Sequence, residues 1–236
     1  MNETKRLSIA MTREERIWGW LYVPFFLVLL SWILAEGFRI LGWDTETLLG
    51  QARLNEAFFG VNFLAAVLIF RKFLSKSLVM VGKRFWGFLQ AVILGLAMYY
   101  AGALLISWGI QFWRGDLENV NDAAIIAMAR ESGWVMVVGT VLLTPVAEEC
   151  MFRGLIFQGL HRHNRAAAYA LSTGIFCLVH MVGYVGQVEL STLAILTLEY
   201  LPAGIALCWA YEKADTIFAP ILMHGLVNAL SIRMLW

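Results

Sequence analysis

The sequence contains little charge. Of its 236 residues, only 15% are Asp, Glu, Lys or Arg, whereas 60% are hydrophobic. A soluble globular domain carries about 25% charged and roughly 45–50% apolar residues. The shortage of charge therefore excludes an ordinary soluble enzyme and a disordered chain. The formal net charge is +1, so there is no excess of basic residues and nucleic acid is not expected as a partner.

The sequence also contains few cysteines. The three cysteines, Cys150, Cys177 and Cys208, all lie in apolar runs, and no Cys-x-x-Cys pair occurs. Disulfide frameworks and thiolate zinc sites are recognised by cysteines at characteristic spacings. The sequence therefore encodes neither kind of site.

Long apolar runs make up most of the chain. A transmembrane helix needs about 20 mostly apolar residues, and the first such run is too long for a signal peptide. Seven stretches qualify: Ile17–Leu41, Ala57–Phe73, Trp86–Phe112, Trp134–Leu160, Ala166–Tyr184, Leu190–Tyr211 and Thr216–Trp236. The predicted fold class is an all-α, polytopic transmembrane bundle of about seven spans in a lipid bilayer.

Basic residues are distributed unevenly among the connections. Four precede the first span and five lie at or beyond the end of the second: Lys5, Arg6, Arg13, Arg16, Arg71, Lys72, Lys76, Lys83 and Arg84. The connections of the other side carry only Arg53, Arg114 and Arg130. The positive-inside rule predicts a cytoplasmic amino terminus. We expect a multi-pass protein of the cell membrane, with its carboxy terminus outside.

One connection, Arg114–Gly133, is long. Asn121 or Asp122 is expected to cap a short helix over Ala123–Arg130, and Gly133 to end it. The apolar residues expected to face the bilayer surface are Ile125, Ile126, Met128 and Ala129. The sequence thus predicts an interfacial helix. We expect this helix to be the last element of an amino-terminal part that comprises residues 1–133.

Ionisable residues within the spans point to function, because a charge at the bilayer centre costs about 3 kcal/mol or more. Glu149 and Arg153 are spaced i, i+4 with the acid first, which favours an ion pair. Glu148 points about 100° away around the helix. The spacing predicts that Arg153 holds one acid and leaves the other free. The alternative is an ordinary helix end in water, which the apolar run continuing to Leu160 disfavours.

Two further polar groups lie in later spans. Phe176 and His180 share one helix face, as do His224 and Asn228. Alone, each group is compatible with hydrogen-bonded helix packing. Helix rise places Glu148, His180 and His224 roughly 18, 21 and 12 Å from the cytoplasmic ends of their spans, which is one layer. A carboxylate, two imidazoles and a carboxamide suit a water-activating hydrolytic site or a metal site.

The three motifs resemble those of a known family. Glu-Glu-x-x-x-Arg, Phe-x-x-x-His and His-x-x-x-Asn, in this order on three helices, resemble the CPBP intramembrane proteases. These include type II CAAX prenyl endopeptidases and bacteriocin-processing or immunity proteins. The resemblance covers about residues 134–236, which it implies are the catalytic core of one integrated bundle. It also implies an eighth span, for which Asp116–Arg130 is the candidate.

The resemblance implies an endopeptidase that acts on a membrane-embedded or lipidated peptide. The implied catalytic residues are Glu148 and His180, which would activate a water, and His224 and Asn228, which would stabilise the oxyanion. The implied supporting residues are Glu149, Arg153 and Phe176.

Alternatives remain open at this point. Glu148, His180 and His224 suit the ligand set of a zinc metalloprotease, although His-Glu-x-x-His is absent. The same fold also serves a non-proteolytic scaffold or bacteriocin self-immunity protein. An ion-coupled transporter is disfavoured, because paired broken helices are absent. Glu199 in the sixth span either bonds to backbone freed by Pro202 or lines the substrate cavity.

Overall fold

The computed structural model describes residues 7–235, with side chains through residue 233, and this part of the chain contains no strand. Lys5 and Arg6 lie outside the described residues. Six helices are long and apolar enough to cross a membrane: Arg13–Ile40, Leu48–Ile69, Phe85–Arg114, Trp134–His161, Arg165–Val182 and Leu190–Ala214. The predicted all-α, polytopic fold is confirmed, and the chain is a multi-pass membrane protein.

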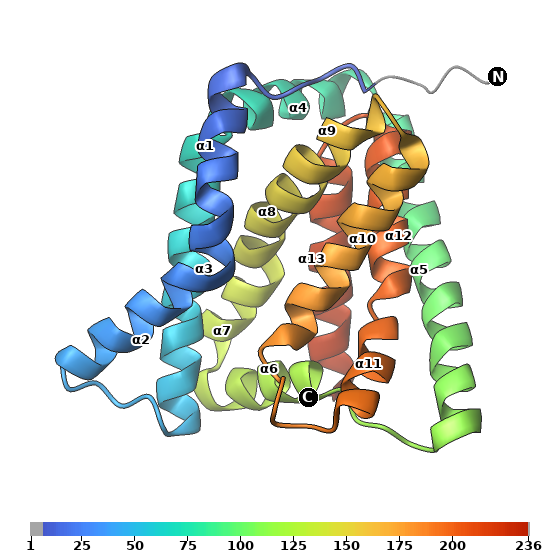
Figure 1. Cartoon of the computed structure of the whole chain (residues 1–236). Coiled ribbons are helices and arrows are strands. Elements are labelled where there is room, and N and C mark those ends of the chain that lie inside the picture. Colours follow the sequence, from blue (N-terminus) through green and yellow to red (C-terminus); the bar gives the residue numbers. More distant parts are fainter. Residues whose placement is uncertain (1–6, 236) are drawn as a thin grey trace.

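The elements follow one another with short connections (Figure 1). The amino-terminal part comprises α1 (Arg13–Pro24), the π-helical η1 (Phe25–Leu29), α2 (Leu30–Ile40), α3 (Leu48–Ile69), α4 (Arg71–Lys83), α5 (Phe85–Arg114) and α6 (Val120–Ser132). The remainder comprises α7 (Trp134–Val138), η2 (Gly139–Leu143), α8 (Thr144–Glu149), η3 (Cys150–Phe157), α9 (Gln158–His161), α10 (Arg165–Val182), α11 (Leu190–Leu198), α12 (Leu201–Ala214) and α13 (Phe218–Leu235).

The predicted boundaries of the second span were wrong at both ends, since α3 ends at Ile69 rather than Phe73 and α4 begins at Arg71. The second span begins at Leu48 rather than Ala57, because Thr47 accepts a hydrogen bond from the Gly50 N–H and caps the helix there. Its first turns carry polar residues, which hid them from a search for apolar runs. The seventh predicted span corresponds to α13, which packs against α5, α12, η2 and α8.

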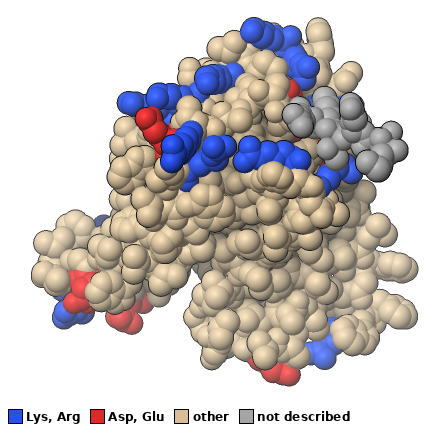
Figure 2. All heavy atoms as spheres, turned by 45° about the horizontal axis from the view of Figure 1, so that its top comes forward, with Lys and Arg blue, Asp and Glu red and all other residues tan. Residues whose placement is uncertain are grey.

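Basic residues gather at one end of the bundle. The predicted cytoplasmic connection is the helix α4, which lies across the end where α1 begins (Figure 1). It buries Phe73 and Ser77 and exposes Arg71, Lys72 and Lys76. Figure 2 shows Lys and Arg collected over this end. Helix α13 ends at the opposite end of the bundle (Figure 1).

Helix α6 closes that opposite end. Gly133 ends it at φ 70°, as predicted, but the cap is Asn119 rather than Asn121 or Asp122, because the Asn119 side chain accepts from both of their N–H groups. At 13 residues, α6 is about 20 Å long. It is therefore too short for a bilayer core of about 30 Å and does not provide an eighth span.

The apolar face of α6 is not turned to lipid. Met128 and Ala129 pack with Ala52 and Phe59 of α3, and Ile126 is also buried. The prediction that these residues face the bilayer surface was wrong, because α3 extends far enough to cover them.

The motif-bearing helix, α7 to α9, is the most buried of the six spans. Pro145 in the first turn of α8 has no N–H for the Val141 carbonyl one turn earlier. A Cβ atom at Gly225 would lie 2.6 Å from that Val141 oxygen. Glycine at this position therefore lets α13 approach closely and brings His224 and Asn228 against the motif-bearing helix.

The orientation can be tested by cysteine labelling. Lys76 on α4 and Glu118 before α6 are exposed, whereas the three native cysteines are buried. A membrane-impermeant thiol reagent added to intact cells should label Glu118→Cys. It should miss Lys76→Cys and Lys5→Cys until the cells are permeabilised. Labelling of Lys76→Cys in intact cells would contradict a cytoplasmic α4.

Candidate active site

The Glu149 carboxylate lies at the centre of the site. Both Glu149 and Arg153 are fully buried, and Arg153 Nη1 lies 3.0 Å from Glu149 Oε1. The ion pair predicted from their spacing is present. His224 Nδ1 from α13 lies 2.9 Å from the same oxygen, so its ring N–H donates to the carboxylate. Glu149 is therefore committed to two partners from two helices.

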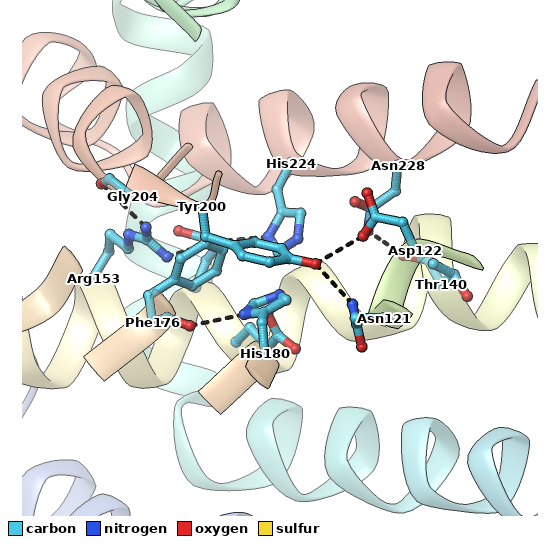
Figure 3. Close-up of polar contacts among 12 residues, drawn as sticks. Asn121, Asp122, Thr140, Arg153, Phe176, His180, Tyr200, Gly204, His224 and Asn228 are labelled. Carbon is cyan, nitrogen blue, oxygen red and sulfur yellow. Dashed lines mark hydrogen bonds and ion pairs between the residues drawn. The ribbon is translucent and has the colours of Figure 1, made fainter. Parts of the chain in front are cut away.

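Arg153 is held by two further contacts. Its Nη2 donates to the Gly204 carbonyl at 3.2 Å (Figure 3). Its guanidinium carbon lies 4.4 Å from the centroid of the Phe176 ring, a cation–π contact. A Cβ atom on Gly204 would lie 2.5 Å from the Thr173 side chain, so glycine allows α12 to pack this closely on α10.

Phe176 lies between the polar groups. Its ring centroid is 4.4 Å from that of His180 and 5.9 Å from that of His224. The predicted supporting residue therefore contacts Arg153 and both imidazoles.

Glu148 is placed differently from Glu149. Its side chain is 13% exposed, and Oε2 lies 3.9 Å from His180 Nε2, too far for a direct hydrogen bond. This Oε2 has no hydrogen-bond partner among the described residues. His180 Nδ1 lies 2.8 Å from the Phe176 carbonyl, which can only accept. The ring therefore carries its proton on Nδ1, where Figure 3 shows the bond to Phe176, and leaves Nε2 as the atom nearest Glu148.

Asn228 anchors the last helix. Its Nδ2 donates to the Thr140 carbonyl of η2 at 2.8 Å, which leaves a second amide hydrogen. Asn228 and His224 thus share one helix face, as predicted, but each bonds to a different element. The structure brings all seven predicted site residues into one region.

Sequence reasoning missed a network beside His180. The Tyr200 ring lies 4.5 Å from the His180 ring, tilted by 30°. The Tyr200 hydroxyl lies 2.8 Å from Asp122 Oδ1 and 3.1 Å from both Asn119 Oδ1 and Asn121 Nδ2. Figure 3 shows this hydroxyl reaching the start of α6. The polar run at residues 119–122 was the available signal, but it was interpreted only as a cap.

The sixth span is broken where this network meets it. Helix α11 ends at Leu198 and α12 starts at Leu201, with Pro202 in its first turn. Glu199 at the break accepts from Asn119 Nδ2 at 2.6 Å. Of the two alternatives for Glu199, this bond supports a structural role, but the partner is a side chain of the α6 cap rather than backbone freed by Pro202.

The candidate zinc ligands do not fit a metal centre as they stand. Among the described residues, no three His, Cys, Asp or Glu side chains are grouped so that they could hold a metal ion. Glu148 Oε2 is 3.9 Å from His180 Nε2, and each imidazole has its Nδ1 engaged, His180 with the Phe176 carbonyl and His224 with Glu149, which leaves both Nε2 atoms for other partners.

The two glutamates should differ in stability. Glu149→Gln and Arg153→Leu each leave a buried group without its charged partner, and we expect each to lower the free energy of unfolding by about 3–5 kcal/mol. Glu148→Gln leaves the ion pair of Arg153 intact and should change the free energy of unfolding by less than about 1 kcal/mol. Reversible unfolding in mixed micelles measures all three. Equal stability of Glu149→Gln and Glu148→Gln would contradict this assignment.

One family model matches the part of the chain that contains the site. Residues 130–230 match a family model described as Type II CAAX prenyl endopeptidase Rce1-like. This region begins in α6 and contains the residues of all three motifs. Searches of curated proteins and of solved structures find no match. Through this region the chain is similar to the Rce1-like family of type II CAAX prenyl endopeptidases, which agrees with the resemblance of its motifs to the CPBP proteases.

Proposed function

We propose that this chain is an intramembrane endopeptidase of the cell membrane, with a cytoplasmic amino terminus. It hydrolyses a peptide bond in a membrane-embedded or lipidated peptide. The family match supports protease chemistry. The observation that carries the proposal is the difference between two adjacent carboxylates. Glu149 is held by Arg153 and His224, whereas Glu148 makes neither contact and has its Oε2 3.9 Å from His180 Nε2. Each carboxylate has one oxygen without a hydrogen-bond partner among the described residues, but only Glu148 is free of an ion pair with Arg153.

Glu148 acts as the general base in this proposal. A water between Glu148 Oε2 and His180 Nε2 would donate one hydrogen to each, because a 3.9 Å separation suits a bridging water. The Phe176 carbonyl fixes the His180 ring by its bond to Nδ1. Glu148 takes the proton as the water oxygen attacks the scissile carbonyl carbon, and later returns it to the leaving amine.

His224 and Asn228 stabilise the oxyanion. When His224 carries both ring protons, Nε2–H donates to the oxyanion, while Glu149 accepts from Nδ1 and balances the charge. Asn228 uses one amide hydrogen on Thr140 and offers the other. Both donors are fixed before the substrate binds, so little reorganisation is needed in the transition state.

The decisive variant is Glu148→Gln, which keeps the side-chain shape and removes the base. We expect it to lower hydrolysis by at least about 10²–10⁴-fold, while the protein still inserts and stays monodisperse. The readout is the set of new peptide termini in membranes of cells that express the wild type, Glu148→Gln or the exposed control Glu118→Gln. The control should match the wild type.

Two results would overturn the proposal in different ways. Near wild-type cleavage by Glu148→Gln would remove Glu148 from the base role. A folded wild type that generates no new termini, also with prenylated CAAX peptides as probe, would favour the non-proteolytic scaffold or immunity protein.

Metal dependence has its own test. The proposed mechanism uses no metal, so activity should survive exhaustive chelation, and elemental analysis should find less than one metal ion per chain. If chelation abolishes cleavage and zinc restores it, a zinc centre on Glu148, His180 and His224 replaces this mechanism.

A further inference from the structure

A small cavity lies behind Glu148, on the side of α3. It has a volume of about 10 Å³, and its lining includes three aromatic and three polar side chains: Phe26, Phe58, Phe59, Asn62, Thr144 and Glu148. This volume is the space in which the centre of a water molecule can move. A cavity needs about 10–15 Å³ of such space, and polar groups around it, to hold one water. The cavity is therefore the size of one water.

Three of the lining residues each carry a buried polar atom without a partner in the described part of the chain. Asn62 Nδ2, Thr144 Oγ1 and Glu148 Oε2 all lack a hydrogen-bond partner among the described residues. Native proteins leave few such atoms, since each costs about 1–3 kcal/mol. The occurrence of three of them around a single cavity indicates a shared partner.

Tyr22 bonds to the oxygen end of the Asn62 amide. Asn62 is 2% exposed, and the Tyr22 hydroxyl donates to its Oδ1 at 2.6 Å. The amide oxygen is thereby used, and the NH₂ group is left as a donor. Tyr22 lies in α1 and Asn62 in α3, so this bond also connects two spans.

We propose that this cavity binds one water molecule, which Asn62 and Thr144 hold against the Glu148 carboxylate. The water accepts from Asn62 Nδ2–H and from the Thr144 hydroxyl, and it donates to Glu148. Both of its lone pairs are then occupied, so it cannot be the water that attacks the substrate. Its role, which rests on the proposed function of Glu148, is to fix the orientation of the base. Asn62 and Thr144 are positioning residues that act through this water.

Hydroxyl-radical footprinting by X-ray radiolysis tests the water without any substrate. Radicals form from bound water and oxidise adjacent side chains even when these are buried. Phe26 and Phe59 are only 5% and 7% exposed, yet we expect both to be oxidised in the purified wild type. Phe70, which is fully buried and does not line the cavity, should be spared. Oxidation should be lost in Asn62→Leu and in the isosteric Thr144→Val.

Kinetics test the positioning role. Asn62→Leu and Thr144→Val should lower kcat on the order of 10-fold with an unchanged KM, because the base is disordered while substrate binding is untouched. Tyr22→Phe breaks the same bond between α1 and α3 but keeps the amide donor. It should retain the oxidation of Phe26 and most of kcat. Asn55→Leu, on the same helix but outside the cavity, serves as the matched control.

Each outcome decides one question. If Phe26 and Phe59 are oxidised no more than Phe70 in the wild type, the water site is wrong. If Tyr22→Phe reproduces the full loss seen in Asn62→Leu, Asn62 is only a link between helices. If the footprint behaves as expected and no substrate is cleaved, the water site stands and the proposed protease function fails.

Discussion

The buried ion pair between Glu149 and Arg153 is the constraint on which the site depends. Removing two charges from water is costly, and their attraction offsets this only when further hydrogen bonds satisfy the remaining groups. Here His224 on α13 and Gly204 on α12 supply hydrogen bonds and Phe176 on α10 supplies a cation–π contact, while Glu149 Oε2 and Arg153 Nε have no hydrogen-bond partner among the described residues. The pair thus fixes the positions of three helices around the motif-bearing span, and the placement of both imidazoles follows from it.

This arrangement gives two neighbouring acids different roles. The helix turns by about 100° between consecutive residues, so only Glu149 faces Arg153 and His224. Glu148 faces His180 on one side and the cavity beside Asn62 on the other. A single Glu-Glu pair therefore provides both a structural anchor and a carboxylate that is free for proton transfer.

Local patterns in the sequence predicted much of this. The i, i+4 pair of Glu149 and Arg153 depends on helix geometry alone. Apolar runs reveal most spans, because the thickness of the bilayer sets the length of a transmembrane helix. Contacts between distant segments could not be predicted in this way. The bonds of Asn119 to Glu199 and of Tyr22 to Asn62 join residues 80 and 40 positions apart. Residue type did not distinguish these polar side chains from ordinary loop or helix residues, and the true start of α3 was hidden by its polar first turns.

The most direct test of this division between the acids is a pair of double-mutant cycles on the free energy of unfolding. One cycle combines Glu149→Gln with Arg153→Leu, and the other combines Glu148→Gln with Arg153→Leu. Residues in direct contact couple by about 0.5–3 kcal/mol, whereas independent sites add within about 0.5 kcal/mol. The account predicts strong coupling of Arg153 to Glu149 and additivity with Glu148. Equal or stronger coupling of Arg153 to Glu148 would contradict it.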